Sequence, residues 1–175
     1  MAFDAEKTAR ALQTRLRTRL SSALDAVEAT WVAEGDPLTL ADPITWFFGH
    51  KPTVLEMDSV SFPFVAVVVA ERMPQAGPAR WGYQEQDLNL FVDFFVVAAV
   101  ETTVNKVACR YAEAIGAVLQ EERYVGDYMQ ADWEPEVHLS EASRHAARQA
   151  DADMFDESDV DFIQGGRIVV KLEGS

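Results

Sequence analysis

The chain has 175 residues, of which 49% are apolar and 25% are charged, and this balance is typical of a folded globular protein. It excludes collagen-like, low-complexity and globally disordered chains. The 15 Lys and Arg residues stand against 29 Asp and Glu residues, which gives a net charge of −14. A chain this acidic is a poor candidate for wrapping nucleic acid, because such binding neutralises phosphates with cations.

Cysteine usage and targeting signals set the expected compartment. Cys109 is the only cysteine, so no intrachain disulfide can form and a reducing compartment is expected. The first residues lack the basic segment and apolar core of a signal peptide. The longest apolar runs, residues 62–70 and 94–100, fall far short of the roughly 20 residues that cross a bilayer. We therefore expect a soluble protein made in the cytoplasm.

Residues 4–33 have the pattern of one long amphipathic helix that ends at Gly35 and Pro37. Its apolar stripe, with spacings of three and four residues, consists of Leu12, Leu16, Leu20, Leu24, Val27 and Trp31. The first 20 residues carry five basic side chains, including Arg15 and Arg19, against two acidic ones. A positive helix on an acidic body indicates either head-to-tail attraction between copies or a solvated helix face.

Residues 35–60 predict a long irregular connection, since they hold three prolines and two glycines. Three consecutive aromatic residues, Trp46, Phe47 and Phe48, lie within it. Connections of this length are usually functional. The aromatic side chains either fold back on the core or contact a partner, and the sequence leaves both interpretations open.

Two segments rich in Val and Phe, residues 61–71 and 87–100, predict a pair of long strands. The residues between them, 72–86, predict an extended hairpin loop that contains Trp81 and Tyr83. Both faces of the second strand are largely apolar, because one face presents Phe91, Phe95 and Val97. Helices can cover one face, so we expect a neighbouring subunit to cover the other.

Residues 101–123 predict a second helix, with Thr102 or Thr103 as its N-cap. Its inner stripe consists of Val104, Ala108, Tyr111, Ile115 and Val118 or Leu119. On this helix we expect Gly116 to permit close packing against a strand. We expect Cys109 to occupy a packing position rather than a reactive one.

The last third of the chain predicts short elements around an acidic insertion, residues 140–161. Residues 134–139 predict a short strand, and the Ala-rich residues 140–150 predict one or two helical turns. Residues 151–161 carry six acids and no base, and we expect them to be mobile. Gly165 and Gly166 predict a turn or bulge before a final strand-like run.

The order of these elements predicts a single α+β domain over residues 1–175. In this fold class a mostly antiparallel sheet with a long β-hairpin packs against the long N-terminal helix and the second, central helix.

No catalytic, cofactor-binding or metal-binding motif is found in the sequence. His50, His138 and His145 are the only imidazoles, and no two of them have metal-ligand spacing beside cysteines. A calcium loop that starts at Asp151 fails, because its fifth and sixth positions are Phe155 and Asp156. We therefore expect no enzymatic activity, no cofactor and no specific metal site.

The element order and several local patterns resemble the tail terminator family of long-tailed bacteriophages, over residues 5–172. An aromatic-Pro pair opens a Val-rich strand at residues 62–67, and Trp81-Gly82-Tyr83 lies in the hairpin loop. The second strand ends in Phe94-Phe95-Val96-Val97, and a helix over residues 105–120 and a last β region follow. The acidic residues 140–161 are an insertion relative to the minimal pattern.

The resemblance implies a structural virion protein without catalysis or cofactor. Such proteins form a ring, hexameric in this family, that caps the tail tube, ends its polymerisation and offers a surface to the head–tail connector. DNA would pass through the lumen without specific binding, and an acidic wall would suit that passage. The partners expected from it are further copies of the chain, the tail tube protein and the connector, in the tail or neck of a virion assembled in the host cytoplasm.

Two alternatives remain beside this interpretation. The first is another ring subunit of the same head–tail neck. The second is a small-ligand-binding or enzymatic α+β domain in which the loops of Trp46 and Trp81 close a pocket. For a ring, we expect neighbouring subunits to be contacted by Trp46, Phe47, Phe48, Trp81, Tyr83, Arg15 and Arg19.

Overall fold

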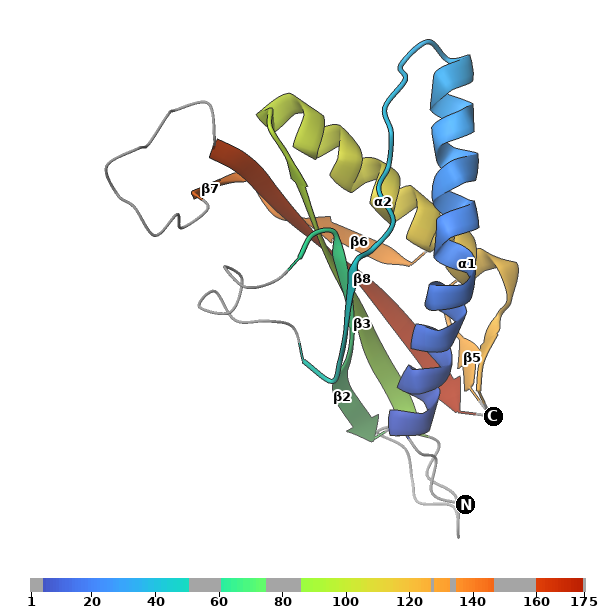
Figure 1. Cartoon of the computed structure of the whole chain (residues 1–175). Helices are drawn as coiled ribbons and strands as arrows, with labels where there is room; N and C mark the ends of the chain where they lie inside the picture. Colours follow the sequence, from blue (N-terminus) through green and yellow to red (C-terminus); the bar gives the residue numbers. More distant parts are fainter. Residues whose placement is uncertain are drawn as a thin grey trace, which may run out of the picture.

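The computed structural model describes residues 5–50, 61–74, 86–126, 128–132, 135–146 and 160–174 (Figure 1). Within these ranges two helices combine with a sheet, so the α+β class is confirmed. The helices are α1 (Ala5–Ala33) and α2 (Glu101–Glu121). The strands are β1 (Thr45–Phe48), β2 (Phe64–Pro74), β3 (Gln86–Ala98), β4 (Tyr124–Val125), β5 (Tyr128–Gln130), β6 (Glu136–Leu139), β7 (Ser143–Ala146) and β8 (Val160–Gly174).

Helix α1 forms as its apolar spacing predicts, and its stripe is buried from Leu12 to Val27. The helix ends where Gly35 takes a left-handed conformation, with φ of 85°. Amide groups beyond the last turn donate to the carbonyls of Thr30, Trp31 and Val32. These hydrogen bonds satisfy carbonyls that a helix end leaves unpaired. The left-handed Gly35 reverses the chain, which then runs alongside α2.

The sheet has eight strands in the order β1-β2-β3-β8-β5-β4, and β6 and β7 also pair with β8. Strands β2 and β3 are antiparallel, as are β3 and β8, whose register runs from Leu88 opposite Leu172 to Ala98 opposite Phe162. Strand β1 is parallel to β2. The sheet is therefore mixed: its long strands are antiparallel, as expected, but one edge pair is not.

Within the described ranges, strand β8 pairs with four other strands of the sheet. One of its edges pairs with β3, and β7, β6 and β5 follow one another along the other edge. Its 15 residues span about 50 Å at ordinary strand rise. A strand of this length gives the sheet two extended faces that have to be covered or left open.

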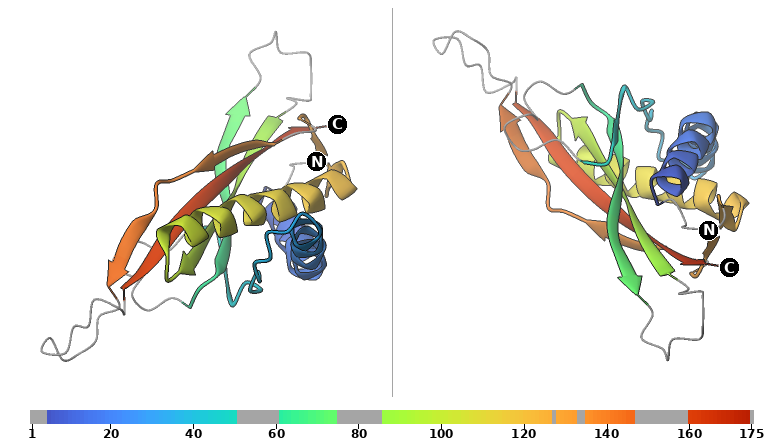
Figure 2. Two further views of the ribbon diagram at one scale, coloured as in Figure 1. Left: turned by 90° about the horizontal axis from the view of Figure 1, so that it is seen from above. Right: turned by 90° about the horizontal axis from the view of Figure 1, so that it is seen from below.

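Both helices pack on the same face of the sheet, as the two views of Figure 2 show. Alternate residues of the long strands meet the helix stripes in one hydrophobic core. The strand residues of this core are Val65, Val67, Leu88, Leu90, Val92, Phe94, Val96, Ile168, Val170 and Leu172.

Two segments expected to be irregular or helical are strands. Residues 45–48, inside the expected long connection, form β1, because the edge of β2 offers them backbone partners from Phe64 to Val67. Residues 143–146, expected to form a helical turn, are β7 and pair with residues 160–163 of β8. Helix propensity from alanine is a weak preference, and pairing with a long neighbouring strand overrides it.

Gly165 and Gly166 do not form a turn; both lie inside β8. A Cβ atom built on Gly165 would come within 2.6 Å of the Phe95 ring, and one on Gly166 would overlap the Phe94 ring. The two aromatic side chains therefore lie across the strand where it has no side chains. The glycines are packing positions and not a chain reversal.

The predicted N-cap of α2 is wrong, whereas its predicted inner stripe is confirmed. The N-cap position is Val100, without a side-chain hydrogen bond, and not Thr102 or Thr103. Strand β3 ends at Ala98, and the α2 helix therefore begins before either threonine can cap it. The expected inner stripe of the helix is buried, from Val104 to Leu119.

Two small residues of α2 do not pack as expected. Cys109 is exposed, and a Cβ atom added to Gly116 would have no neighbour within 4 Å. Neither residue lies on the stripe that faces the sheet. Gly116 therefore does not serve close helix–strand packing. The expected mobile segment, residues 151–161, lies outside the described residues except for Val160 and Asp161, which begin β8.

Candidate functional site

The sheet face opposite the helices, called here the open face, is covered by neither α1 nor α2 (Figure 2). It alternates with the core face along each strand, because successive side chains of a strand point to opposite sides. Its members are Phe64, Ala66 and Val68 of β2, Phe91, Asp93, Phe95 and Val97 of β3, and Ile163, Gly165, Arg167 and Val169 of β8.

Phe64 is the centre of an aromatic cluster on the open face. Its ring stacks on Phe95 at 4.9 Å between centroids, meets Phe47 edge-on at 5.3 Å and lies 5.5 Å from Phe62. Phe64 itself is fully buried, whereas the three rings around it are only partly buried. The cluster therefore presents aromatic surface outward, as protein interfaces do at their anchor residues.

An ion pair lies beside this cluster. Arg167 donates from Nε and Nη2 to the two carboxylate oxygens of Asp93, at 2.6 and 2.8 Å. The Asp93 side chain is 3% exposed and that of Arg167 is 36% exposed. The hydrogen bonds that Arg167 donates to Asp93 raise the pKa of Arg167, and its guanidinium also lies over the ring of Phe91, 4.1 Å from the ring centroid. Such a forked pair fixes both side chains in one geometry.

A groove of about 340 Å³ opens next to the ion pair, over β8 and lined by residues of β3, β6 and β8. Its walls include Phe95, Leu139 and Ser140, and His138 lies opposite Arg167 in the register of β6 and β8. The Nε2 atom of His138 is 2.9 Å from a carboxylate oxygen of Glu136. Ser140 Oγ donates to the Gly165 carbonyl and accepts from its amide. The polar groups of the groove therefore pair with one another.

Helix α1 and strand β1 form a second surface, called here the cationic row, which consists of Arg10 and Arg17 over Phe48 and Trp46. The guanidinium carbon of Arg10 lies 4.3 Å from the Phe48 ring centroid, and that of Arg17 lies 5.5 Å from the Trp46 ring. Gln13, between the two arginines, donates to the carbonyl of Phe47 at 2.9 Å. A spacing of seven residues keeps both arginines on one helix face.

The residues expected at an interface separate into three groups in the structure. Trp46 and Phe48 face α1, whereas Phe47 joins the aromatic cluster on the open face. Arg15 and Arg19 turn the other way, toward the C-terminal end of α2, where Arg15 pairs with Glu122 at 3.1 Å and Arg19 with Glu121 at 3.9 Å. Trp81 and Tyr83 lie outside the described residues. The predicted set therefore does not form one surface.

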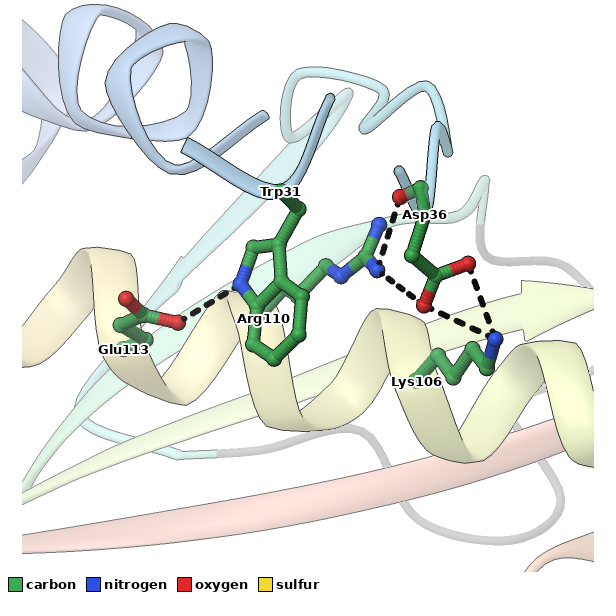
Figure 3. A network of polar contacts seen from close by, with 5 residues as sticks. All are labelled: Trp31, Asp36, Lys106, Arg110 and Glu113. Atoms are coloured by element: carbon green, nitrogen blue, oxygen red, sulfur yellow. Dashed lines mark hydrogen bonds and ion pairs between the residues drawn. The ribbon is translucent and has the colours of Figure 1, made fainter. Parts of the chain in front are cut away.

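A third polar cluster fastens the chain after α1 to α2 (Figure 3). Asp36 accepts from Lys106 at 2.9 and 3.0 Å and from Arg110 at 2.8 Å, and these contacts, the Lys106 hydrogen bond first, lower its pKa. Arg110 is 2% exposed and lies over the ring of Trp31, whose Nε1 donates to Glu113 at 3.2 Å. The cluster is a structural latch that joins the two segments through Arg110 Nη2 and Lys106, whereas the buried Nη1 of Arg110 has no hydrogen-bond partner among the described residues.

Tyr111 holds the same segment further along. Its hydroxyl donates to the carbonyl of Ala41, and burial raises the pKa of this phenol. Together with the Asp36 latch, this bond positions residues 36–44 so that β1 can begin at the edge of β2. The first half of the expected irregular connection is therefore fixed to the helix layer.

Sequence reasoning missed the Asp93–Arg167 pair and the Asp36 latch. One signal was present, since Asp93 is a single acid inside an apolar strand, and a buried acid requires a partner. Its partner, Arg167, is 74 residues away, and only the register of β3 and β8 brings the two together.

Comparisons with known proteins leave this geometry as the main evidence for function. No protein-family model matches the chain, and no curated protein is significantly similar to it. In the described ranges no three His, Cys, Asp or Glu side chains are grouped as metal ligands would be. Neither α1 nor α2 is long and apolar enough to cross a membrane.

Proposed function

We propose that this chain is a ring-forming structural subunit of a bacteriophage tail, of the tail terminator type. One observation carries the proposal: both helices cover one face of the sheet, and on the opposite face the partly exposed rings of Phe47, Phe62 and Phe95 surround the buried Phe64. A closed ring of copies is one way to shield such a face. The order of a long helix, a long β-hairpin, a central helix and a last β region supports the terminator type.

In this proposal the ring caps the tail tube, ends its growth and receives the head connector, and DNA passes through the lumen. The net charge of −14 supports passage without binding, because like charges keep phosphates from the wall. The protein has a structural role in the virion and performs no catalysis. The charge and the open face would fit another ring subunit of the head–tail neck equally well. The position of the ring in the assembled particle therefore has to distinguish a terminator from another neck subunit.

The groove beside Arg167 is the observation that favours the second alternative, a ligand-binding domain. Its aromatic wall and polar floor are features of small-molecule sites. However, the carboxylate of Asp93 and the guanidinium of Arg167 are already paired, as are Glu136 and His138. We therefore place this groove within the subunit interface, where Phe95 and Leu139 meet the neighbouring copy.

The proposal predicts that a charge on the open face prevents assembly. Val97 is half-exposed on β3, and Val97→Glu would place a carboxylate in an interface that excludes water. We expect rings to be at least tenfold fewer, by light scattering and negative-stain images of the full chain, alone and co-expressed with the tail tube protein of the same genome. The folded subunit should lose about 1 kcal/mol of stability at most.

Val32→Glu is the matched control, because Val32 is 51% exposed near the end of α1 and lies off the open face. Rings that form equally well from Val97→Glu and Val32→Glu would contradict the role of the open face. If the wild-type chain forms no rings when it is co-expressed with the tail tube protein, the ring proposal itself is wrong. The triple change of Trp46, Phe47 and Phe48 to polar residues is less decisive, since these residues also pack within the subunit.

A further inference from the structure

The cationic row is a surface that is built for an acidic partner. Arg10 and Arg17 are exposed on α1, and their guanidinium groups lie over partly buried aromatic rings of β1. Arg10 also pairs with Glu6 at 2.7 Å, whereas Arg17 forms no ion pair within the described ranges. Arginine and tryptophan are the residues that most often anchor protein interfaces. The protein as a whole is strongly acidic, so solubility alone does not explain why two exposed arginines lie together on this surface.

The chain itself contains a segment of matching chemistry, residues 151–159, called here the acidic segment. Its sequence carries five acids and no base, and Met154 and Phe155 lie at its middle between Asp153 and Asp156. Carboxylates form strong charge-assisted hydrogen bonds with guanidinium groups. Methionine and phenylalanine side chains pack favourably on aromatic rings. The acidic segment thus offers both kinds of contact that the cationic row can accept.

Chain length indicates which copy supplies the segment. Asp153 is seven residues from the end of β7 at Ala146 and seven from the start of β8 at Val160, so chain length limits its Cα atom to about 25 Å from Val160. Phe48 is in register with Val67, Val92 and Ile168, so it lies three strand spacings from β8. Ile168 is eight residues from Val160 along β8, and the two offsets together place Phe48 about 30 Å from Val160. Trp46 is two residues nearer to Val160, at about 24 Å, so the acidic segment reaches only one end of its own cationic row, and only when fully extended, and it cannot cover the whole row.

We propose that the acidic segment of one copy docks on the cationic row of the next copy. The inference rests on the proposed ring, because a head-to-tail contact of this kind closes into a ring when the rotation allows. It explains why basic residues cluster in the first helix while residues 151–159 concentrate acids. DNA is the other polyanion that the row could accept, and the net charge of −14 disfavours it.

A labelled peptide of residues 147–161 tests the contact without requiring assembly. Its binding to the full chain is measured by fluorescence anisotropy, for the wild type and for Arg10→Glu/Arg17→Glu. We expect the double substitution to weaken binding at least tenfold, since it reverses both charges of the row. A peptide with Asp153 and Asp156 changed to lysine should bind equally poorly to the wild type.

The control, Arg19→Glu/Lys171→Glu, changes the net charge by the same amount on other surfaces. Both residues are exposed, at 62% and 47%, and neither contacts β1 in the described ranges. We expect this control to keep peptide affinity within about twofold once salt screens long-range charge. Equal losses in both double variants would show a net-charge effect and overturn the proposal, as would wild-type affinity in Arg10→Glu/Arg17→Glu.

A charge swap tests the same contact during assembly. Chains with Arg10→Glu/Arg17→Glu and chains with Asp153→Lys/Asp156→Lys should each fail to form rings alone. Mixed in equal amounts they should form rings of alternating copies, because every junction then joins opposite charges. Thermal melting followed by circular dichroism checks that each variant is folded. The absence of rescue in the mixture, with both variants folded, would overturn the proposal.

The outcomes separate this inference from the ring proposal. If rings form but do not respond to Arg10→Glu/Arg17→Glu, the ring stands and the docking contact is wrong. If the peptide binds as expected but no wild-type rings appear at tail tube ends, the contact stands and the ring is wrong. A double-stranded DNA fragment that displaces the peptide from the row at 0.15 M salt would replace the partner proposed here by nucleic acid.

Discussion

At the residue scale, two ion pairs, each with one buried and one partly exposed partner, join parts of the sequence that are far apart. Asp93 and Arg167 connect β3 with β8 on the open face, and Asp36 and Arg110 connect the end of α1 with α2. A buried pair does not by itself add much stability, because desolvation offsets the attraction between the charges. Removing one partner is costly, since the other charge is left without compensation. Both pairs are therefore expected to specify the geometry of the fold.

The Asp93–Arg167 pair predicts strong coupling between two substitutions. Asp93→Leu should cost about 2–3 kcal/mol of unfolding free energy, a value reduced from that of a fully buried pair because Arg167 is partly exposed. Arg167→Met added to Asp93→Leu should recover at least 1 kcal/mol of that loss. Urea unfolding of the wild type, both single variants and the double variant measures the coupling. Additive losses would contradict it.

The Asp36 latch predicts a dependence of stability on pH. The hydrogen bonds and charges of Lys106 and Arg110 lower the pKa of Asp36 below its ordinary value of 3.8. The group therefore contributes stability above pH 3.8, and the contribution is lost as the pH falls through the lowered pKa. We expect the melting temperatures of the wild type and Asp36→Asn to differ by a constant amount from pH 8 to 5 and to converge in acid.

The matched control is Asp25→Asn, because Asp25 is exposed on α1 and forms no ion pair in the described ranges. Its melting temperature should follow that of the wild type at every pH. If Asp36→Asn also follows the wild type, the latch contributes nothing to folding stability.

Neither pairing could be identified from the sequence, for a physical reason. Asp36 follows a helix end, where an acid is ordinarily solvated, and Arg110 lies on a helix whose stripe was recognised only by its apolar members. Which acid meets which base depends on helix crossing and strand register, and these are set by the packing of the whole core. Local spacing therefore predicts the elements but not these contacts.

At the element scale, sequence patterns predicted the long elements and the short strand β6 correctly and failed at the short strands β1 and β7. Helices α1 and α2 and strands β2 and β3 have enough residues for a period to be read. Strands β1 and β7 have four residues each, and they exist because β2 and β8 offer unpaired backbone edges. Their formation is a tertiary effect, so no pattern in their own residues predicts it.

A glycine of β8 and a glycine of α2 predict opposite effects of the same substitution to alanine. Gly166→Ala would push a methyl group into the fully buried Phe94 ring and within 2.9 Å of Leu139, and should cost about 1–3 kcal/mol. Gly116→Ala meets no atom within 4 Å on α2 and should gain about 0.5–1 kcal/mol from helix propensity. Urea unfolding of the two variants measures both values.

Gly166→Ala/Phe94→Leu supplies the control for the close contact, because the smaller side chain leaves room for the new methyl group. If Gly166→Ala costs no stability in the Phe94 background, the ring does not hold the position that the structure gives it. A loss in Gly116→Ala would indicate that this face of α2 is covered in the assembled protein.

At the scale of the whole molecule, the open face and the cationic row would join copies through different forces. Burial of aromatic rings around Phe64 is insensitive to salt or strengthened by it, whereas carboxylate–guanidinium contacts at the rim are screened. A subunit that uses both should assemble most readily at low salt and retain part of its assembly at high salt. Salt dependence is therefore a property of the whole interface that separates its two parts.

This argument predicts a difference in salt response between variants. Between 0.1 and 1 M NaCl the screening length falls from about 10 Å to about 3 Å, so the wild type should lose ring population as its cationic row is screened. The Arg10→Glu/Arg17→Glu chain should start lower and change little, or gain, because salt also screens its new repulsion. The Val97→Glu chain should form few rings at any salt concentration, since its defect lies on the apolar face. Analytical ultracentrifugation across the salt series measures all three, and a wild-type curve parallel to that of Arg10→Glu/Arg17→Glu would show that the cationic row takes no part in assembly.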